Sequence, residues 1–450
     1  MDYFDYRPQK FYLLSREKRR LFSFVSEDRS VENAVENAFA KLPRIEGGNI
    51  YALYRFSPLV LEVMAELSEK LKVHVCNIQQ LPSYFKGFRD NDVFIRHNAS
   101  VDIIDIRRSL IKIKAIENNR NENADDNCFV LTWGILYQKY ETYSYGLLTE
   151  KIYIGEKDPE ARICRFCENT GKNYFKNESH AIMESLGNKL LLCNEECDEC
   201  NTLFEEKGVE NNLYRFLEIN RTLSRIPGKK TRNHSLEGLN FCIRPDKDLS
   251  MPVVFIKQDK IINDVYNGAP TGRVLLFNKG EVSYYGIFKA LVKIAVDMIP
   301  SCKFSHFVNT GKWVHGDMAD MEFPPFLYGE HNEFFEQPVL DLFFKTNNSP
   351  SFSPFCTAIL YIYDAIFIYA IPFCNVDENI YTSKESILNH WNYFKKRQYL
   401  YVGEWAEIDS NDKTLKSPFY KLPLFSDTQK YKIEFKPSDD DVFKRPKNKE

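Results

Sequence analysis

Two pairs of cysteines in the middle of the chain constrain its fold more than any other feature. Cys164 and Cys167, and then Cys197 and Cys200, are each spaced as Cys-x-x-Cys. Each pair can present two thiolates to one tetrahedral Zn²⁺, and two matched pairs argue against unrelated free thiols. The sequence therefore predicts one structural zinc site, with Cys193 as a nearby thiol that does not bind the metal.

The segment between the two pairs is expected to leave the metal and return to it. Residues 168–196 separate the pairs, whereas paired zinc knuckles are usually about 15–20 residues apart. The segment contains His180, between a strand-like stretch and a turn at Gly187 and Asn188. Asn201 begins a predicted helix, so zinc that joins hairpin to helix would bring His180 and Asn201 face to face. The apolar residues of that helix are Leu203, Phe204, Val209, Leu213, Phe216 and Leu217.

This arrangement resembles the HNH endonucleases of the ββα-metal type, in their four-cysteine, treble-clef form. In the most similar subgroup, a Cys-x-x-Cys pair precedes a His, a Pro-Glu-Ser-Leu-Gly-Asn stretch, a Cys-Asp-x-Cys-Asn-x-x-Phe stretch and a helical Glu. The resemblance covers the cysteine-rich segment and neither flank. The matching residues are Cys164, Cys167, His180, Glu184, Ser185, Leu186, Gly187, Asn188, Cys197, Asp198, Glu199, Cys200, Asn201, Phe204 and, with one residue such as Gly208 inserted, Glu210.

The resemblance implies metal-dependent hydrolysis of DNA phosphodiester bonds. His180 would be the general base that takes a proton from water. Asn201 would coordinate a catalytic Mg²⁺ or Mn²⁺ that stabilises charge on the phosphate. The family also has an asparagine that bonds the backbone and holds the catalytic loop. Asn188 matches it by motif and Asn194 by its distance along the chain from Cys200, and both stay candidates.

The residue before the histidine departs from the family. Ser179 stands where the family has an acidic metal ligand, and a hydroxyl is a weak ligand for a hard cation. Glu178 could substitute, although strand alternation would point it to the other face. The alternative function is therefore a non-catalytic treble-clef zinc module that binds nucleic acid or protein. A second metal beside His180 and Asn201 would distinguish the two.

A basic segment follows the predicted helix. RTLSRIPGKKTRNH, residues 221–234, contains no acid, and the chain as a whole carries a net charge of −3. Nucleic-acid binding must therefore come from a local patch, and this segment is a candidate for gripping the phosphates of double-stranded DNA, with a solvated face as the equal alternative. Its basic residues are Arg221, Arg225, Lys229, Lys230 and Arg232.

The predicted fold class is α+β, and 450 residues, which exceed one ordinary domain, predict more than one domain. A zinc-stapled ββα module of the treble-clef HNH type over 156–235 would lie between two larger regions. These are an N-terminal α/β region over 1–155 and a C-terminal mixed α/β region over 236–435, followed by a charged tail over 436–450. By analogy with nucleases of this build, the flanks suggest a role in bacterial defence, with a homo-oligomer or accessory defence proteins as partners.

Local patterns predict particular elements in the N-terminal region. Residues 49–56 read as a strand, followed by a helix with Ser57 as its N-cap and Pro58 at its first position. A second, parallel strand is expected over 72–78. The polar run over 115–127 reads as an exposed loop.

Further along the chain, two strand-like stretches and one helix stand out. Residues 128–137 and 142–156 are rich in aromatic and branched side chains and are predicted as strands. Residues 282–300 have an amphipathic helical pattern, with Ser283 as the cap and Pro300 as the stop. A third candidate enzyme site, His315, Asp317 and Glu322, has no recognised spacing and reads better as a structured loop.

One apolar stretch, residues 355–374, is long enough to span a bilayer. Asp364 lies at its middle, where a charge costs about 2.5–3.5 kcal/mol. Two buried strands that turn near Asp364 are therefore predicted in a protein that does not enter the membrane. The N-terminus shows no secretory pattern and the scattered cysteines fit reduced thiols, which together favour a cytoplasmic location.

Overall fold

The computed structural model divides the chain into two compact units. The first comprises Met1–Gln138, Ser144–Glu150 and Lys396–Tyr399, and the second comprises Lys139–Tyr143, Lys151–Lys395 and Leu400–Glu450. Both contain helices and sheets, so the fold is mixed α+β. The structure describes residues 9–15, 19–24, 29–47, 51–72, 78–97, 103–117, 128–147, 151–206, 208–226, 235–244, 252–266, 269–276, 281–377, 384–398, 400, 402–417, 419–423 and 432–436.

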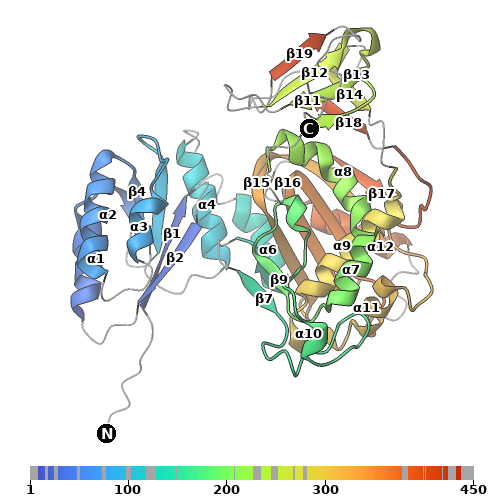
Figure 1. Cartoon of the computed structure of the whole chain (residues 1–450), viewed down its shortest axis with the longest axis horizontal. Coiled ribbons are helices and arrows are strands. Elements are labelled where there is room, and N and C mark those ends of the chain that lie inside the picture. The colour runs from blue at the N-terminus through green and yellow to red at the C-terminus, as the bar shows by residue number, and fades with distance from the viewer. Residues whose placement is uncertain are drawn as a thin grey trace, which may run out of the picture. The chain divides into compact units, whose positions relative to one another are not determined.

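The first unit is built on a five-stranded antiparallel sheet (Figure 1). Its strands are β1 (Gln9–Ser15), β2 (Arg19–Phe24), β3 (Arg44–Gly47), β4 (Tyr51–Arg55) and β5 (Val93–His97), in the spatial order β2-β1-β5-β4-β3. Its helices include α1 (Arg29–Ala40), α2 (Pro58–Leu71), α3 (Leu81–Tyr84) and α4 (Ile103–Glu117). The first three pack on one sheet face around Phe39, Tyr54 and Phe94. Alternation turns His97 to the other face, where its ring hydrogen-bonds Ser109 of α4 (2.7 Å).

Strand β4 and helix α2 confirm the strand and helix predicted on either side of Ser57, and Pro58 is the first helical residue. The Ser57 side chain makes no capping hydrogen bond. The polar run begins within α4, and its remainder over 118–127 lies outside the described residues, as does most of the strand predicted over 72–78.

The strand predicted over 128–137 is wrong, because this segment is helical and α6 spans Trp133–Lys139. Phe129, Trp133 and Leu136 recur at helical spacing and are buried, and the rings of the first two stack at 5.5 Å. Composition favoured a strand, but the period of the buried positions decides the element. The second stretch is confirmed in part, by β6 (Tyr140–Tyr145) and β7 (Ile152–Ile154).

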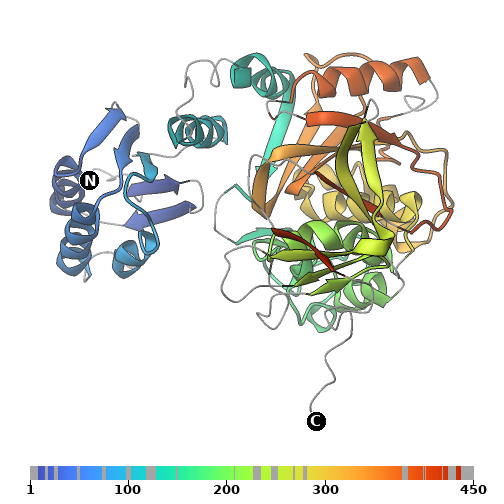
Figure 2. The same cartoon turned by 90° about the horizontal axis from the view of Figure 1, so that it is seen from above.

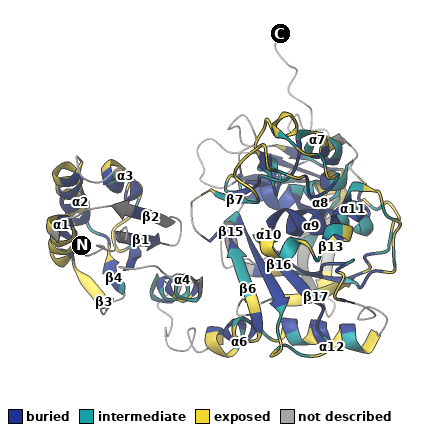
Figure 3. Ribbon diagram, turned by 90° about the horizontal axis from the view of Figure 1, so that it is seen from below, coloured by how far each residue is buried: buried dark blue, intermediate teal, exposed yellow. Residues whose placement is uncertain are grey.

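The second unit is centred on helix α9 (Tyr284–Met298) and a long antiparallel hairpin of β15 (Phe326–Lys345) and β16 (Cys356–Ala370). Strand β17 (Val402–Ile408) and β6 also pair with β15. Figure 3 shows α9 and the hairpin mostly as buried. The other helices of this unit are α7 (Asp198–Glu206), α8 (Val209–Leu223), α10 (Ser301–Phe304), α11 (Val308–His315) and α12 (Lys384–Lys395).

Two small sheets pack with the end of α8 through a shared core that includes Leu223, Phe241 and Leu275 (Figure 2). In one, β19 pairs parallel to β12 and the other pairings are antiparallel. The strands of this sheet are β10 (Leu236–Glu237), β11 (Phe241–Arg244), β12 (Val253–Lys257) and β19 (Lys432–Lys436). The strands of the other are β13 (Asn263–Tyr266), β14 (Ala269–Leu276) and β18 (Phe419–Pro423). Beyond Lys436, the predicted charged tail lies outside the described residues.

Most of the apolar stretch 355–374 forms one continuous strand, β16 (Cys356–Ala370), and the turn predicted near Asp364 is wrong. The chain instead bulges there: Tyr363 has a φ of +56°, and the register with β15 shifts at this point. Asp364 lies beside the bulge, where its carboxylate accepts a hydrogen bond from Asn220 of α8 (2.8 Å). In the described part of the chain, no helix is both long and apolar enough to cross a membrane.

Helix α9 confirms the helix predicted over 282–300. The Ser283 hydroxyl accepts a hydrogen bond from the Gly286 amide (3.1 Å), and the helix ends before Pro300. The amphipathic pattern does not mark an exposed face, however, because Lys293 and Asp297 are as buried as the apolar residues around them.

The two predicted serine caps give a matched test of α9. Ser283→Ala removes a capping bond and should lower the free energy of unfolding by about 1 kcal/mol. Ser57→Ala removes no such bond and should change stability much less. Calorimetric unfolding of the two variants would measure the difference. Equal effects would contradict the role given to the Ser283 hydroxyl.

Candidate metal centre

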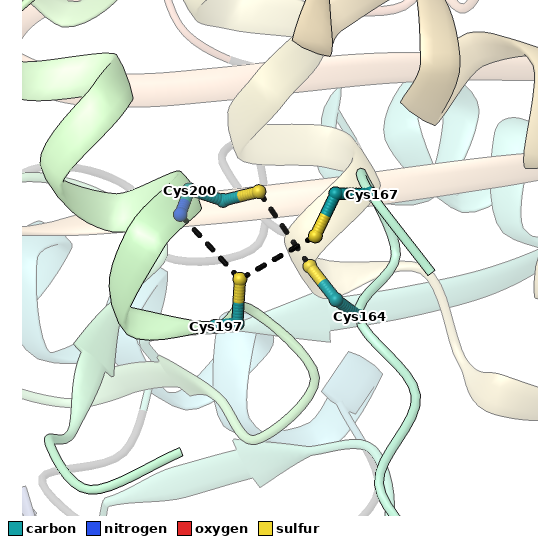
Figure 4. A group of neighbouring side chains, drawn as sticks. All are labelled: Cys164, Cys167, Cys197 and Cys200. Carbon is teal, nitrogen blue, oxygen red and sulfur yellow. Dashed lines mark hydrogen bonds between the residues drawn. The ribbon is translucent and has the colours of Figure 1, made fainter. Parts of the chain in front are cut away.

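The two cysteine pairs meet in the structure as the sequence predicts. The four Sγ atoms of Cys164, Cys167, Cys197 and Cys200 all lie within 4.8 Å of one another (Figure 4). Cys164 Sγ lies 3.7 Å from Cys200 Sγ, and Cys167 Sγ lies 3.5 Å from Cys197 Sγ. Four sulfurs at about 2.3 Å from a tetrahedral Zn²⁺ are about 3.8 Å apart. The cluster therefore has the ligand set and size of a structural zinc site, and we call it the cysteine clasp.

Local backbone geometry forms each half of the clasp. In the first pair, the Glu168 amide donates to the Cys164 carbonyl (3.1 Å), and Glu168 takes a left-handed φ of +61° that turns the chain back. In the second pair, Cys197 directly precedes α7, and the Cys200 amide donates to the Cys197 sulfur (3.4 Å). Hydrogen bonds from the thiols of Cys164 and Cys200 lower the pKa of Cys197 to about 4, whereas hydrogen bonds with Cys164 and Cys197 raise the pKa of Cys200 well above its usual value.

Arg165, inside the first knuckle, fastens the clasp to the core. Its guanidinium is buried and donates to carbonyls at the C-terminal end of α9, those of Val296 (2.7 Å) and of Ile299 (2.6 Å), the residue directly after the helix. It also pairs with Glu195 (2.8 Å). A cation at the C-terminal end of a helix neutralises unsatisfied carbonyls and the helix dipole. The same knuckle abuts α11, because a Cβ at Gly311 would collide with the Arg165 carbonyl oxygen.

The segment between the two pairs forms a hairpin. Strand β8 (Ser179–His180) pairs antiparallel with β9 (Leu191–Cys193), and β7 pairs parallel with β9 on its other side. Helix α7 follows, so the order around the clasp is strand, strand, helix. The predicted long helix is in fact two, because α7 ends at Glu206 and α8 begins after Gly208, which has a φ of +77°.

Asn188 organises the loop between β8 and β9. Its buried side chain donates to the carbonyls of Ile182 (2.8 Å) and Leu191 (2.9 Å), and it accepts from the amides of Leu190 (3.0 Å) and Leu191 (2.9 Å). Asn194, the other candidate for this task, bonds through its backbone amide to Ile154 (2.8 Å). The loop-holding bonds thus belong to Asn188.

His180 ends β8 and is half-buried. Burial lowers its pKa, while the negative charge of Glu184 opposes that shift more strongly than that of Glu178. Asn201 lies in the first turn of α7, where its amide donates to the Cys197 carbonyl (2.9 Å). Within the described residues, no hydrogen bond joins His180 to Asn201.

The two residues before His180 are engaged elsewhere. Ser179 is buried and its hydroxyl donates to Glu196 (2.6 Å). Glu178 is exposed and its carboxylate accepts from Lys151 (2.7 Å) and Tyr153 (2.7 Å). Neither side chain is therefore positioned as the acidic ligand that the family has at this place.

Sequence reasoning missed a buried charge cluster behind β8. The Lys293 ammonium lies 3.0 Å from a carboxylate oxygen of each of Glu196, Glu210 and Asp297. Burial alone would lower the pKa of Lys293, but the three carboxylates raise it well above its usual value. Burial, and then the charge of Asp297, raise the pKa of Glu196 to about 8. The available signal was a Lys and an Asp four residues apart inside a largely apolar helix.

The predicted phosphate-binding residues are only partly described. Arg221 is buried and donates to the Tyr214 hydroxyl (2.8 Å), so it is not presented to a phosphate on the surface. Arg225 is half-buried just past the end of α8, with a φ of +57°. Lys229, Lys230 and Arg232 lie outside the described residues.

The third candidate site lies at the end of α11. His315 and Asp317 form a pair at 2.8 Å, and Asp317 is exposed. Glu322 is exposed in the segment that follows. The pair belongs to the turn after α11, which fits the structured loop predicted there.

Comparisons with known proteins identify no relative. No protein-family model matches the chain, and no curated protein and no solved structure matches it. A functional assignment therefore depends on the residues of the site and their geometry.

The clasp predicts one zinc ion per chain. Cys197→Ser should abolish zinc binding and strongly destabilise the second unit, because structural zinc contributes about 10–16 kcal/mol of apparent binding energy. Cys193→Ser, a buried neighbour outside the clasp, should retain one zinc. Elemental analysis by mass spectrometry would measure both contents. Zinc retained in the first variant, or lost in the second, would contradict this ligand set.

The contact between the clasp and α11 can be tested at Gly311. Gly311→Ala forces a methyl group against the Arg165 backbone and should lower the free energy of unfolding by about 1–3 kcal/mol. Gly403→Ala is the matched control, because a Cβ there meets nothing within 4 Å. Denaturant unfolding would compare them. Equal stability of the two variants would show that the knuckle does not pack as described.

Proposed function

We propose that this chain is a metal-dependent endonuclease of the HNH type that hydrolyses DNA phosphodiester bonds. The observation that carries the proposal is the strand–strand–helix segment at the cysteine clasp, with His180 at the end of its first strand and Asn201 in the first turn of its helix. This is the order of chemical groups that the resemblance to HNH endonucleases requires. In this proposal zinc is structural, and a separate Mg²⁺ or Mn²⁺ is catalytic.

His180 is assigned the role of general base. Because burial lowers its pKa, its imidazole is neutral at pH 7 and can accept a proton from water. The Asn188 hydrogen bonds hold the loop that follows His180, and the Tyr363 hydroxyl donates to the Leu186 carbonyl in the same loop (2.9 Å). The loop is thereby anchored both within itself and to β16.

Asn201 and Glu184 are assigned to the catalytic cation. An amide oxygen and a carboxylate are suitable ligands for Mg²⁺ or Mn²⁺. When bound, the cation would stabilise the negative charge that develops on the phosphate and the leaving oxygen. We choose Glu184 for the acidic position because its charge acts more strongly on His180 than that of Glu178, whose carboxylate is already paired with Lys151.

A phosphodiester hydrolase of this kind would have DNA as its partner. The cytoplasm is the proposed location. Of the basic segment, Arg225 and the residues beyond it remain candidates for phosphate binding, while Arg221 has a role inside the protein. A task in cellular defence, with a second copy or accessory proteins, is proposed by analogy with nucleases embedded in larger chains.

One observation favours the second candidate function, a zinc module that binds nucleic acid without cutting it. Ser179 is committed to Glu196 and Glu178 to Lys151, so the family's acidic ligand has no direct replacement at its own position. A site that lacks this carboxylate would bind the catalytic cation weakly.

Nicking of supercoiled plasmid tests the proposal. Wild type should nick with Mg²⁺ or Mn²⁺, and His180→Ala should lower the rate about 100-fold or more, because it removes the general base. His315→Ala, which alters a histidine away from the clasp, is the control. Leaving Mg²⁺ and Mn²⁺ out of the reaction should stop nicking while the zinc content, measured in the same sample, is unchanged.

Two outcomes would contradict the nuclease assignment. Equal nicking by wild type and His180→Ala would exclude this site as the source of the activity. Plasmid binding without cutting, under either cation, would favour the zinc module that binds nucleic acid.

A further inference from the structure

Lys293 is the meeting point of four segments around the cysteine clasp. It lies inside α9 and its side chain is completely buried. Its ammonium reaches the His180 carbonyl (3.4 Å) and one carboxylate oxygen each of Glu196, Glu210 and Asp297, at 3.0 Å. These residues belong to β8, to the residue before Cys197, to α8 and to α9 itself.

Stability alone is a poor explanation for this cluster. Removing an ammonium and carboxylates from water is costly, and apolar residues of similar volume often stabilise a core equally well or better. The cluster holds three carboxylates around one ammonium, so it is also not neutral when fully ionised. What directional bonds provide, and apolar packing does not, is a fixed position for each segment.

Strand β8 needs such support because it is very short. It has two residues, and its register with β9 consists of Ser179 opposite Cys193 and His180 opposite Leu192. Lys293 holds it in two ways. The ammonium donates directly to the His180 carbonyl, and it also binds the Glu196 carboxylate oxygen that accepts the Ser179 hydroxyl (2.6 Å).

Lys293 also contacts the helix that carries Asn201. Its ammonium lies over the ring of Phe204, 5.6 Å from the centroid, and Phe204 stands one turn after Asn201 on α7. A single buried side chain therefore touches the two elements that present the proposed base and the proposed cation ligand.

We infer that Lys293 is a positioning residue of the proposed nuclease, which fixes β8 against α7 so that the His180 imidazole is held toward the reacting phosphate. This inference rests on the proposed function. Lys293 does not touch the substrate, and it acts through the His180 backbone and through the Glu196–Ser179 hydrogen bond.

The test uses the full chain and two variants. Each removes contacts that link Lys293 to β8, one at the charge cluster and the other at Ser179. The compensated variant combines Lys293→Met with Glu196→Gln, Glu210→Gln and Asp297→Asn, so no buried charge is left unpaired within the cluster. Ser179→Ala removes only the hydroxyl and leaves all four charged groups. Lys289→Met, the same substitution one turn earlier on α9, is the matched control.

Both variants should keep one zinc and lose turnover. We expect kcat for plasmid nicking to fall about 10- to 100-fold with KM unchanged, because a small misplacement of a catalytic group costs that much. The amides of residues 179–182 should exchange with deuterium faster than in wild type, and those of α12 should not. Lys289→Met should match wild type in both readouts.

The outcomes separate this inference from the proposed function. Unchanged kcat and unchanged exchange in zinc-loaded variants would overturn the positioning role and leave the nuclease standing. If wild type cuts no plasmid, the nuclease proposal fails, and exchange at residues 179–182 still decides whether Lys293 fixes β8. If the compensated variant does not fold, Ser179→Ala decides by the same two readouts.

Discussion

The bond between the Arg165 guanidinium and the last carbonyls of α9 connects the cysteine clasp to the core of the second unit. A knuckle held only by its metal would be free to tilt. Here the residue next to a cysteine ligand is buried and donates to three carbonyls at the end of α9, those of Val296, Asp297 and Ile299. It therefore satisfies acceptors that the helix cannot satisfy itself. These hydrogen bonds consequently hold the clasp against the end of α9.

Helix α9 therefore supports the candidate site along its whole length. The helix begins at the Ser283 cap, where the Ser283 amide also donates to Asn212 of α8 (2.9 Å), and it passes so close to α8 that a Cβ at Gly286 would collide with Asn212. Lys293, in the second half of α9, donates to the His180 carbonyl of β8, and Arg165 donates to the Val296 carbonyl at the C-terminal end of α9. The cysteine-rich segment is thus embedded in the second unit. Lys293, which donates to the His180 carbonyl, lies 113 positions away from it in the sequence.

The sequence was sufficient where local chemistry decides the structure. The Cys-x-x-Cys spacing predicted the clasp, and the apolar period with Ser283 and Pro300 predicted α9. It failed where composition and period disagreed, as at the helix containing Trp133, and where one polar residue marked a bulge rather than a turn, as at Asp364. The Lys293 cluster was not predictable in the same way, because its bonds join a largely apolar helix to residues as far as 83 (Glu210) and 113 (His180) positions away. The hydrophobic pattern of a helix indicates which of its faces is buried, but it does not indicate which residues pack against that face.

X-ray absorption at the zinc edge of the purified chain would test the central claim most directly. The claim is that the four cysteines alone hold the zinc and leave His180 free for chemistry. It predicts a single shell of four sulfur atoms at about 2.3 Å. A shell that mixes sulfur with a nitrogen at about 2.0–2.1 Å would place a histidine on the zinc. That result, or a preparation without zinc, would contradict the account of both the clasp and the base.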